Sequence, residues 1–378
     1  MNRKGRLVIL TGVLLSCLAF QGCENGTPIK ERVIVQNAGV DRVEGGYELS
    51  INAFLSDFAG DAEGGTSKTA FLSREGSTIA DALGGIGKLT GRLPFFSHNQ
   101  AVVIGEETAR DGLEDILDFF SDYFECRPNA GVFLTEGTAK EALELKGKDT
   151  VLAAKDLQQL SQTGNLNGTI SETTVYEVAE TLGKDGMAVC IPILSVLEEG
   201  EDGRLYVEQS GLVKEGRLVD FLTPEETMGV MFLNNEIRQA GIYLHLEEGD
   251  AVTVGIMNAK TDISVGMVDG NPEFTVHVFA EGEPVEKLYR KGEPLDDDFF
   301  LQLNLRCEEE IKQNIESAIR KTVISNQADA LHLGDRIRQT FPDYWKENEL
   351  QWSSKISDCD FKITVDTNIR KLGHSLGG

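Results

Sequence analysis

The alternation of apolar and polar positions predicts a series of strands in the first half of the chain. Tyr47, Leu49, Ile51 and Ala53 are separated by single polar residues, the two-residue period of a strand with one buried face. Shorter apolar runs bounded by turn residues predict further strands at 33–40, 69–73, 99–104, 131–134 and 187–194.

A three-to-four-residue apolar period predicts helices between these strands. Over 106–124, Leu113, Ile116, Leu117 and Phe120 follow an i, i+3, i+4, i+7 spacing, which is typical of an amphipathic helix. Other helices are predicted from Thr78, which can cap, and over 138–145 and 171–182. The polar segments 57–67 and 159–171 predict loops. Alternating strands and helices favour a mixed α/β domain.

The second half of the chain predicts another sheet and a long helix. A hairpin is expected around Glu215-Gly216, and Thr223 to Glu226 has the capping-box pattern with Pro224 at the first helical position. Runs rich in β-branched residues predict an antiparallel sheet over 241–281. The sequence then predicts a strand at 303–305, a helix at 307–326 and a last strand at 361–369.

These elements predict an α+β fold of two or three mixed α/β domains, with antiparallel or mixed sheets flanked by helices. The acidic run 198–203 has the composition of a solvated turn or a linker. We therefore expect an N-terminal domain over 31–197, as one unit or two subdomains, and a C-terminal α/β domain over 205–378.

The first 22 residues have the layout of an export signal. Arg3, Lys4 and Arg6 precede an uncharged apolar stretch from Leu7 to Phe20, which is shorter than the roughly 20 residues that span a bilayer. A polar tether over 23–30 follows. The sequence predicts cleavage of residues 1–22.

The end of this signal resembles a bacterial lipobox, in which a cysteine after a small residue receives a diacylglycerol and becomes the new N-terminus. Gly22-Cys23 is the preferred match, although Phe20 replaces the usual leucine. Leu14 to Cys17 is an alternative that shortens the apolar stretch. An ordinary secreted protein, without lipid, is the third interpretation.

Composition narrows the class of partner. The chain has 378 residues, with 62 Asp and Glu against 36 Lys and Arg, for a net charge of −26. This balance counts against nucleic acid, which requires a basic face, and against an overall electrostatic attraction to anionic lipids. Acyl chains on Cys23 would hold such a body at a membrane.

The residues that usually carry chemistry are scattered. Beyond the signal, Cys126, Cys190, Cys307 and Cys359 lack metal-ligand spacing, and we expect buried thiols, with disulfide pairing left open. The five histidines stand alone; they are His98, His245, His277, His332 and His374. No catalytic, cofactor or metal site is predicted.

Three other motifs favour structural interpretations. The glycine-rich run 84–91 lacks the Ser or Thr that follows the lysine of a phosphate loop, and it is interpreted as the end of a helix. Asp296 to Asp298 lacks the spacing of a calcium loop and predicts a solvated face. Phenylalanine pairs at 95–96, 119–120 and 299–300 are expected in the core.

Several segments in collinear order resemble the Ger(x)C family, the C-subunit lipoproteins of nutrient germinant receptors in endospore-forming bacteria. Besides Cys23, the segments are Ala38–Asp41, His98–Glu107, Glu125–Pro128, Glu136–Leu143, Gly211–Lys214, Leu222–Gly229, Glu308–Gln327, Ala328–Asp335, Phe341–Lys346 and Trp352. The chain departs from the family at Ser121, where an arginine is common, and directly after Cys23.

The resemblance implies a non-enzymatic protein, lipid-anchored on the outer face of the spore inner membrane. It would act with a polytopic membrane A subunit and a membrane B subunit. Two other functions are weighed: an extracytoplasmic ligand-binding lipoprotein of a transport system, and an envelope hydrolase.

Overall fold

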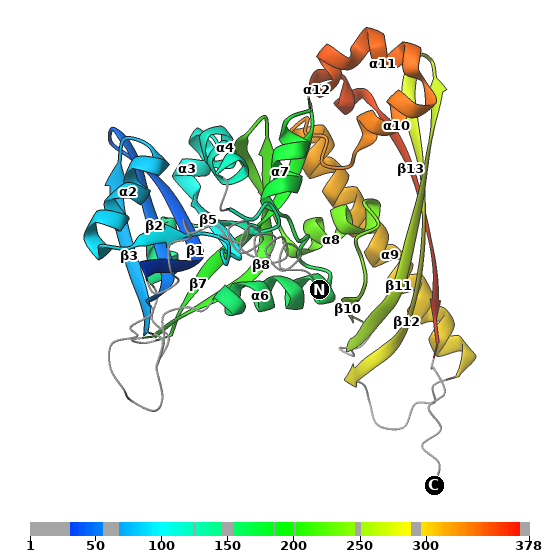
Figure 1. Cartoon of the computed structure of the whole chain (residues 1–378). Coiled ribbons are helices and arrows are strands. Elements are labelled where there is room, and N and C mark those ends of the chain that lie inside the picture. Colours follow the sequence, from blue (N-terminus) through cyan, green and yellow to red (C-terminus); the bar gives the residue numbers. More distant parts are fainter. Residues whose placement is uncertain are drawn as a thin grey trace, which may run out of the picture.

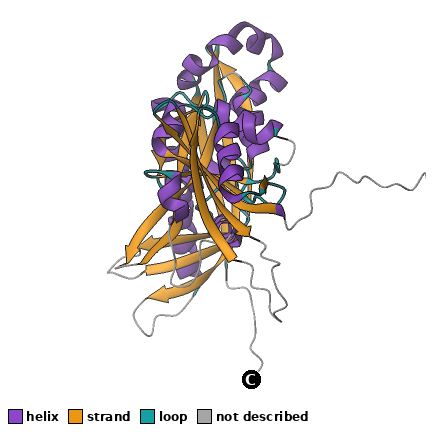
Figure 2. Ribbon diagram, turned by 60° about the vertical axis from the view of Figure 1, so that its left-hand side comes forward, coloured by secondary structure: helices purple, strands orange, loops and turns teal. Residues whose placement is uncertain are grey.

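The structure is a computed structural model, which describes residues 31–55, 68–123, 126–144, 154–184, 186–199, 202–245, 251–288 and 296–370. Two sheets stand side by side in it, and helices lie against both (Figure 1, Figure 2). The prediction of an α+β fold with mixed sheets and flanking helices is confirmed. The predicted signal and tether lie outside the described residues.

The first sheet has nine strands in the order β3-β2-β1-β5-β6-β7-β8-β9, with β4 also paired to β1. Its centre, β1-β5-β6-β7, is parallel, and both sides are antiparallel. The strands are β1 (Arg32–Val43), β2 (Gly46–Leu55), β3 (Lys68–Gly76), β4 (Leu93–Phe95), β5 (Ala101–Gly105), β6 (Gly131–Thr135), β7 (Ala188–Glu199), β8 (Asp202–Lys214) and β9 (Arg217–Leu222).

Helices bury both faces of this sheet. One core forms between the sheet and α2 (Ile79–Thr90), α4 (Glu114–Asp122) and α7 (Val175–Leu182). A smaller core forms with α5 (Ala139–Glu144) and α6 (Ala154–Asn167). Parallel strands need apolar residues on both faces, and β5 and β6 accordingly read as continuous apolar runs.

The second sheet has the order β10-β11-β12-β13. The strands are β10 (Ala240–His245), β11 (Ala251–Val268), β12 (Asn271–Leu288) and β13 (Asp360–Ile369). The long helix α9 (Asp297–Ile319), continued by the π-helix η3 (Arg320–Ser325), packs against it. The short helices α10 (Leu333–Thr340), α11 (Pro342–Asn348) and α12 (Trp352–Lys355) lie at the end of this sheet (Figure 1).

The two sheets share one apolar core. Helix α8 (Pro224–Leu233) lies between them, and Cys190 and Leu212 of the first sheet belong to the same buried cluster as Phe274 and Val276 of the second. Polar contacts support this junction, since the Lys321 ammonium lies 2.8 Å from the Asp220 carboxylate. The halves therefore pack as one body.

Local capping signals identified helix starts correctly. Thr78 accepts a hydrogen bond from the Asp81 N–H at the start of α2. Thr223 and Glu226 form a complete capping box at α8, with Pro224 at the first helical position. The helix predicted from Ser171 begins later, at Val175, because Thr174 and Glu177 form the capping box there.

Two predictions from short windows are wrong. Residues 159–171 are mostly helix α6, which packs Leu157 into the core and folds Gly164 against Ile170. Residues 303–305 belong to α9 and not to a strand, because Leu303 repeats with Cys307 and Ile311 on one buried helical face. The glycine run at 84–91 covers the C-terminal part of α2 and ends at its C-cap Gly91, with φ 64°, in agreement with its interpretation as the end of a helix.

The helix predicted over 106–124 is interrupted. Helix α3 (Glu106–Asp111) ends at Gly112, whose φ of 146° favours glycine, and α4 begins at Glu114. The Leu113 N–H then donates to the Gly216 carbonyl of the β8–β9 turn. The predicted apolar stripe is nevertheless buried along α4.

The two ends of the acidic run 198–203 lie on paired strands. Glu198 pairs with Gly203 and Glu199 with Asp202, so β7 and β8 are antiparallel neighbours. The interpretation of the run as a turn or as a linker stays a prediction. The first sheet continues past it to Leu222, and where the chain divides into domains stays a prediction.

Substitution of Gly229 by alanine tests the packing of α8 on α9. An added Cβ would lie 2.2 Å from the Asn314 carbonyl oxygen, and overpacking of this kind costs about 2 kcal/mol. The matched control is Gly84→Ala in α2, where a Cβ meets nothing within 4 Å. We expect that control to raise stability by about 0.5 kcal/mol. Urea unfolding of both variants measures the difference, and equal effects would contradict the close crossing.

Candidate functional site

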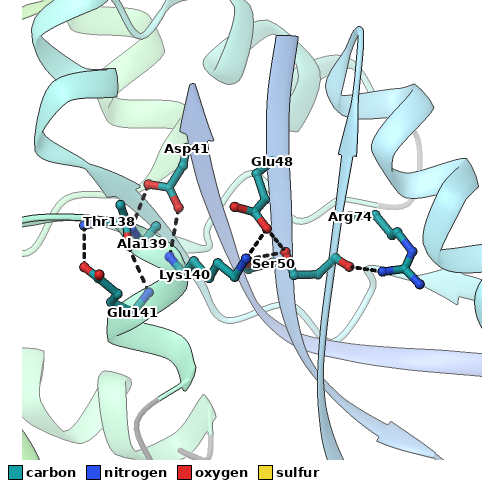
Figure 3. Close-up of polar contacts among 9 residues, drawn as sticks. Asp41, Glu48, Ser50, Arg74, Thr138, Ala139, Lys140 and Glu141 are labelled. Atoms are coloured by element: carbon teal, nitrogen blue, oxygen red, sulfur yellow. Dashed lines mark hydrogen bonds and ion pairs between the residues drawn. The ribbon is translucent and has the colours of Figure 1, made fainter. Parts of the chain in front are cut away.

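Asp41 is a buried carboxylate at the end of β1 that fixes helix α5. Its two oxygens accept hydrogen bonds from the N–H groups of Ala139, at 2.7 Å, and Lys140, at 2.9 Å (Figure 3). Burial raises the pKa of Asp41 above its ordinary 3.8, and the two backbone donors oppose that rise. The carboxylate thus joins β1 to a helix nearly 100 residues later.

Lys140 extends from this anchor to β2. Its ammonium contacts Glu48 at 2.5 Å (Figure 3). Ser73 of β3 donates to the same carboxylate at 2.6 Å. Burial opposes ionisation of Glu48, yet these hydrogen bonds hold its pKa below the ordinary value. These polar groups form a chain of contacts across the sheet.

Asp329 is a second buried carboxylate, with no exposed surface. It accepts from the N–H groups of Leu333 and Gly334, at 2.9 and 2.7 Å, and from the Trp352 indole N–H at 2.8 Å. Burial raises its pKa, and the three donors and His332 oppose that rise. Asp329 therefore fixes the start of α10 and the position of α12 together.

A cavity of about 320 Å³ lies at the junction of the two halves, between α7, β7 and α8. Glu236 lines it and accepts a 2.5 Å hydrogen bond from Ser171. Burial raises the pKa of Glu236 above its ordinary 4.5, while Ser171 and His332 lower it. His332 lines the same cavity and adopts a left-handed backbone conformation.

The raised pKa of Glu236 predicts a pH dependence of folding. The folded chain holds this proton more tightly than the unfolded chain, so its contribution to stability is present at low pH and is lost as pH rises above 4.5. We expect Glu236→Gln to flatten the decline in unfolding free energy between pH 4.5 and neutrality. Chemical unfolding along a pH series measures it, and identical slopes would contradict the assignment.

A larger open cleft of about 860 Å³ lies between α4, α7, the β8–β9 turn and α12. Its walls carry six carboxylates and three cations, from Arg42, Asp111, Glu114, Asp115, Asp118, Lys184, Glu215, Arg217 and Glu349. Arg42 already pairs with Asp111 at 3.2 Å, and Tyr47 donates to Asp115 at 2.5 Å. Acidic side chains therefore outnumber basic ones in the lining of the cleft.

Among the described residues, the histidines and cysteines do not lie together in one site. His277 pairs with Asp366 at 2.7 Å on the exposed face of the second sheet, and His98 lies beside Phe95 on the first half. Cys126, Cys190, Cys307 and Cys359 form no disulfide with one another, and the last three are buried. Within the ranges that the structure describes, no group of three His, Cys, Asp or Glu residues has metal-binding geometry.

The structure also shows the positions of Asp296 and of two of the phenylalanine pairs. Asp296 caps α9 by accepting from the Phe299 N–H, which explains the first residue of the Asp296–Asp298 run. Phe96 and Phe120 are fully buried, whereas their neighbours Phe95 and Phe119 are half-buried. Cys17 and Cys23 lie outside the described residues, and no described helix has the length and apolarity to cross a bilayer.

Asp41 and Asp329 were not identified as anchors from the sequence, because their partners are distant. The available signal was a single carboxylate next to apolar residues, as in Ala38-Gly39-Val40-Asp41 and Ala328-Asp329-Ala330. Such a residue is buried only when donors are supplied from elsewhere. Both anchors lie in segments that carried the family resemblance.

Comparison with models of protein families shows to which family the chain belongs. Residues 25–196 match a model described as "Spore germination protein N-terminal domain", and residues 208–373 match "Spore germination B3/ GerAC like, C-terminal". The chain belongs to the Ger(x)C family of spore germination proteins. The family prediction is confirmed.

Individual relatives agree with this membership. Spore germination protein KC of Bacillus subtilis (strain 168) is 24% identical, over 99% of this chain and 97% of its own. Spore germination protein B3 of the same organism is 22% identical, over 94% and 95%. The crystal structure of the GerBC protein superposes with a TM-score of 0.57 at 19% identity, covering 88% of this Ger(x)C chain and 97% of that one.

Proposed function

We propose that this Ger(x)C protein is a non-enzymatic, lipid-anchored subunit of a nutrient germinant receptor. It would lie on the outer face of the spore inner membrane and act through contacts with a polytopic A subunit and a membrane B subunit. The observation that carries the proposal is the match of family models to both halves of the chain. Cys23, at the end of the export signal, would carry the lipid.

The architecture supports a role in contact rather than in bond-making. The polar clusters at Asp41 and Asp329 use their hydrogen-bonding capacity internally to fix helices. The shared core holds both sheets in one body. A rigid body of this kind suits a subunit whose surface must present a fixed arrangement to partners.

Deletion of the gene tests the role. We expect spores to form normally and to lose or slow their germination with one class of nutrient, because one receptor is incomplete. The readout is loss of optical density after nutrient addition, with the wild-type gene restored at another locus as control. An unchanged response to every nutrient, in a strain that has no redundant receptor, would contradict the proposal.

The 860 Å³ cleft is the observation that favours a second function, ligand binding for a transport system. The volume falls within the range of small-molecule pockets. Its ion-paired walls make it a weaker candidate. Calorimetric titration of the mature chain with small cationic metabolites separates the two, since the receptor proposal requires no such affinity.

A further inference from the structure

The cavity of about 320 Å³ between α7, β7 and α8 is lined by both halves of the chain. We call it the junction cavity. Ser171 and Thr173 lie just before α7, whereas Glu236 follows α8 and His332 precedes α10. A ligand held there would therefore contact segments that are far apart in the sequence.

Glu236 is a partly buried carboxylate in the wall of the junction cavity, without a permanent cation beside it. Burial raises its pKa, and the hydrogen bond from Ser171 and the nearby His332 oppose that rise. An imidazole is a cation only when it is protonated. Lys184 also lines the cavity, but its ammonium lies 3.4 Å from Glu180. A carboxylate that is withdrawn from water is stabilised by a cation, and Glu236 has room to receive one from outside the chain.

Two other polar groups in the same wall lack a hydrogen-bond partner among the described residues. The Asn234 amide nitrogen donates to the Ala330 carbonyl at 3.0 Å, whereas the Asn234 amide oxygen is unpartnered in the described chain. Thr173 is 9% exposed, and within the described ranges its hydroxyl is unpartnered too. Buried polar groups are rarely left unpaired. A ligand with several N–H donors would satisfy both oxygens together with Glu236.

The remaining wall limits the size of the ligand and gives it an apolar side. The apolar part of the lining consists of Ala188, Val189, Cys190, Val230 and Ala330. At about 30 Å³ for each water-sized group, the cavity holds a ligand of about ten non-hydrogen atoms or fewer. The ligand is therefore a small molecule with one polar end.

The charge of the lining favours a cation. Three carboxylates besides Glu236 line the cavity, from Glu172, Glu177 and Glu180. Glu177 belongs to the capping box of α7, and Glu180 contacts Lys184. The lining thus carries four carboxylates against one ammonium and one imidazole. An excess of one sign of charge in a cleft raises the local concentration of ions of the other sign.

We propose that the junction cavity binds a small primary amine, as its ammonium ion, with a short apolar group. An ammonium has three N–H donors, which match the Glu236 carboxylate, the Asn234 amide oxygen and the Thr173 hydroxyl. The apolar group would lie against the valines and alanines of the wall. Such a site goes beyond the proposed receptor role and needs neither the lipid anchor nor a partner subunit.

The test titrates the full mature chain, residues 23–378, with propylammonium chloride. The neutral analogue n-propanol has the same skeleton without the charge, propionate is an anionic analogue, and sodium chloride controls for ionic strength. Ligand-observed NMR measures the dissociation constants. We expect saturable binding of propylammonium, binding of n-propanol that is about ten-fold weaker, and none of propionate, because charge-assisted hydrogen bonds are stronger than neutral ones.

Two variants and a control locate the site. Glu236→Gln keeps the size of the side chain and an acceptor for Ser171, and it should weaken propylammonium binding about ten-fold while leaving n-propanol binding unchanged. Thr173→Val removes only the hydroxyl and should weaken propylammonium binding several-fold. The matched control is Glu225→Gln, at an exposed position in the first turn of α8, which should bind as the wild type does. Urea unfolding shows that each variant is folded, and either cavity variant alone decides the outcome.

Three results would overturn the inference. Equal affinity for n-propanol and propylammonium would show that the charge is not recognised. Propylammonium binding that neither Glu236→Gln nor Thr173→Val weakens would place the amine elsewhere, as in the open cleft of about 860 Å³. Absence of saturable binding would exclude an amine site altogether. None of these results bears on the gene deletion, which tests the receptor role separately.

Discussion

Replacement of Asp329 by alanine is expected to lower the free energy of unfolding by about 4 kcal/mol. The carboxylate has no exposed surface and accepts from Leu333, Gly334 and Trp352. Alanine leaves three buried N–H groups without an acceptor, and each such group costs about 1–3 kcal/mol. The start of α10 and the placement of α12 would loosen together.

Two variants bracket this effect. Asp343→Ala, at an exposed position in the first turn of α11, should change stability by less than about 0.5 kcal/mol. Trp352→Phe removes only one of the three donors and should lie between the two. Denaturant unfolding measures all three. An Asp329→Ala variant as stable as Asp343→Ala would show that the carboxylate does not anchor these helices.

Local sequence was sufficient for most elements of this Ger(x)C fold. The period of Tyr47 to Ala53 identified β2, and the hydroxyl caps at Thr78 and Thr223 located the starts of α2 and α8. These signals act within one strand or one helical turn. A local pattern therefore contains all the information that such an element requires.

The errors arose where distant residues decide the structure. Helix α6 has few apolar positions and gains stability by packing Leu157 between β-strands and α5. Gly112 breaks the helix over 106–124 because Leu113 bonds to Gly216, about 100 residues away. The anchors at Asp41 and Asp329 depend equally on partners that the topology brings together. The lipidation of Cys23, by contrast, is predicted from the residues beside it alone, and it stays a prediction.

Replacement of Cys23 by alanine is the second change with a large expected effect. A diacylglycerol can be attached only through the thiol, and without it a chain of net charge −26 has no strong hold on an anionic membrane. We expect the variant to leave the membrane fraction of spores almost completely. Nutrient-triggered germination through this receptor should fall to the level of the gene deletion.

Cys17→Ala is the matched control, because Cys17 belongs to the alternative lipobox and should be removed with the signal. That variant should be retained at the membrane and should germinate as the wild type does. Immunoblotting of fractionated spores gives abundance and location together. Release by Cys17→Ala with retention of Cys23→Ala would assign the lipid to Cys17.

The most direct test of a lipid-anchored receptor subunit is metabolic labelling of sporulating cells with an alkyne fatty acid. After purification of this chain, the label should be on Cys23 in the wild type and in Cys17→Ala, and absent from Cys23→Ala. A wild-type chain that carries no label yet stays fully in the spore membrane would contradict the account.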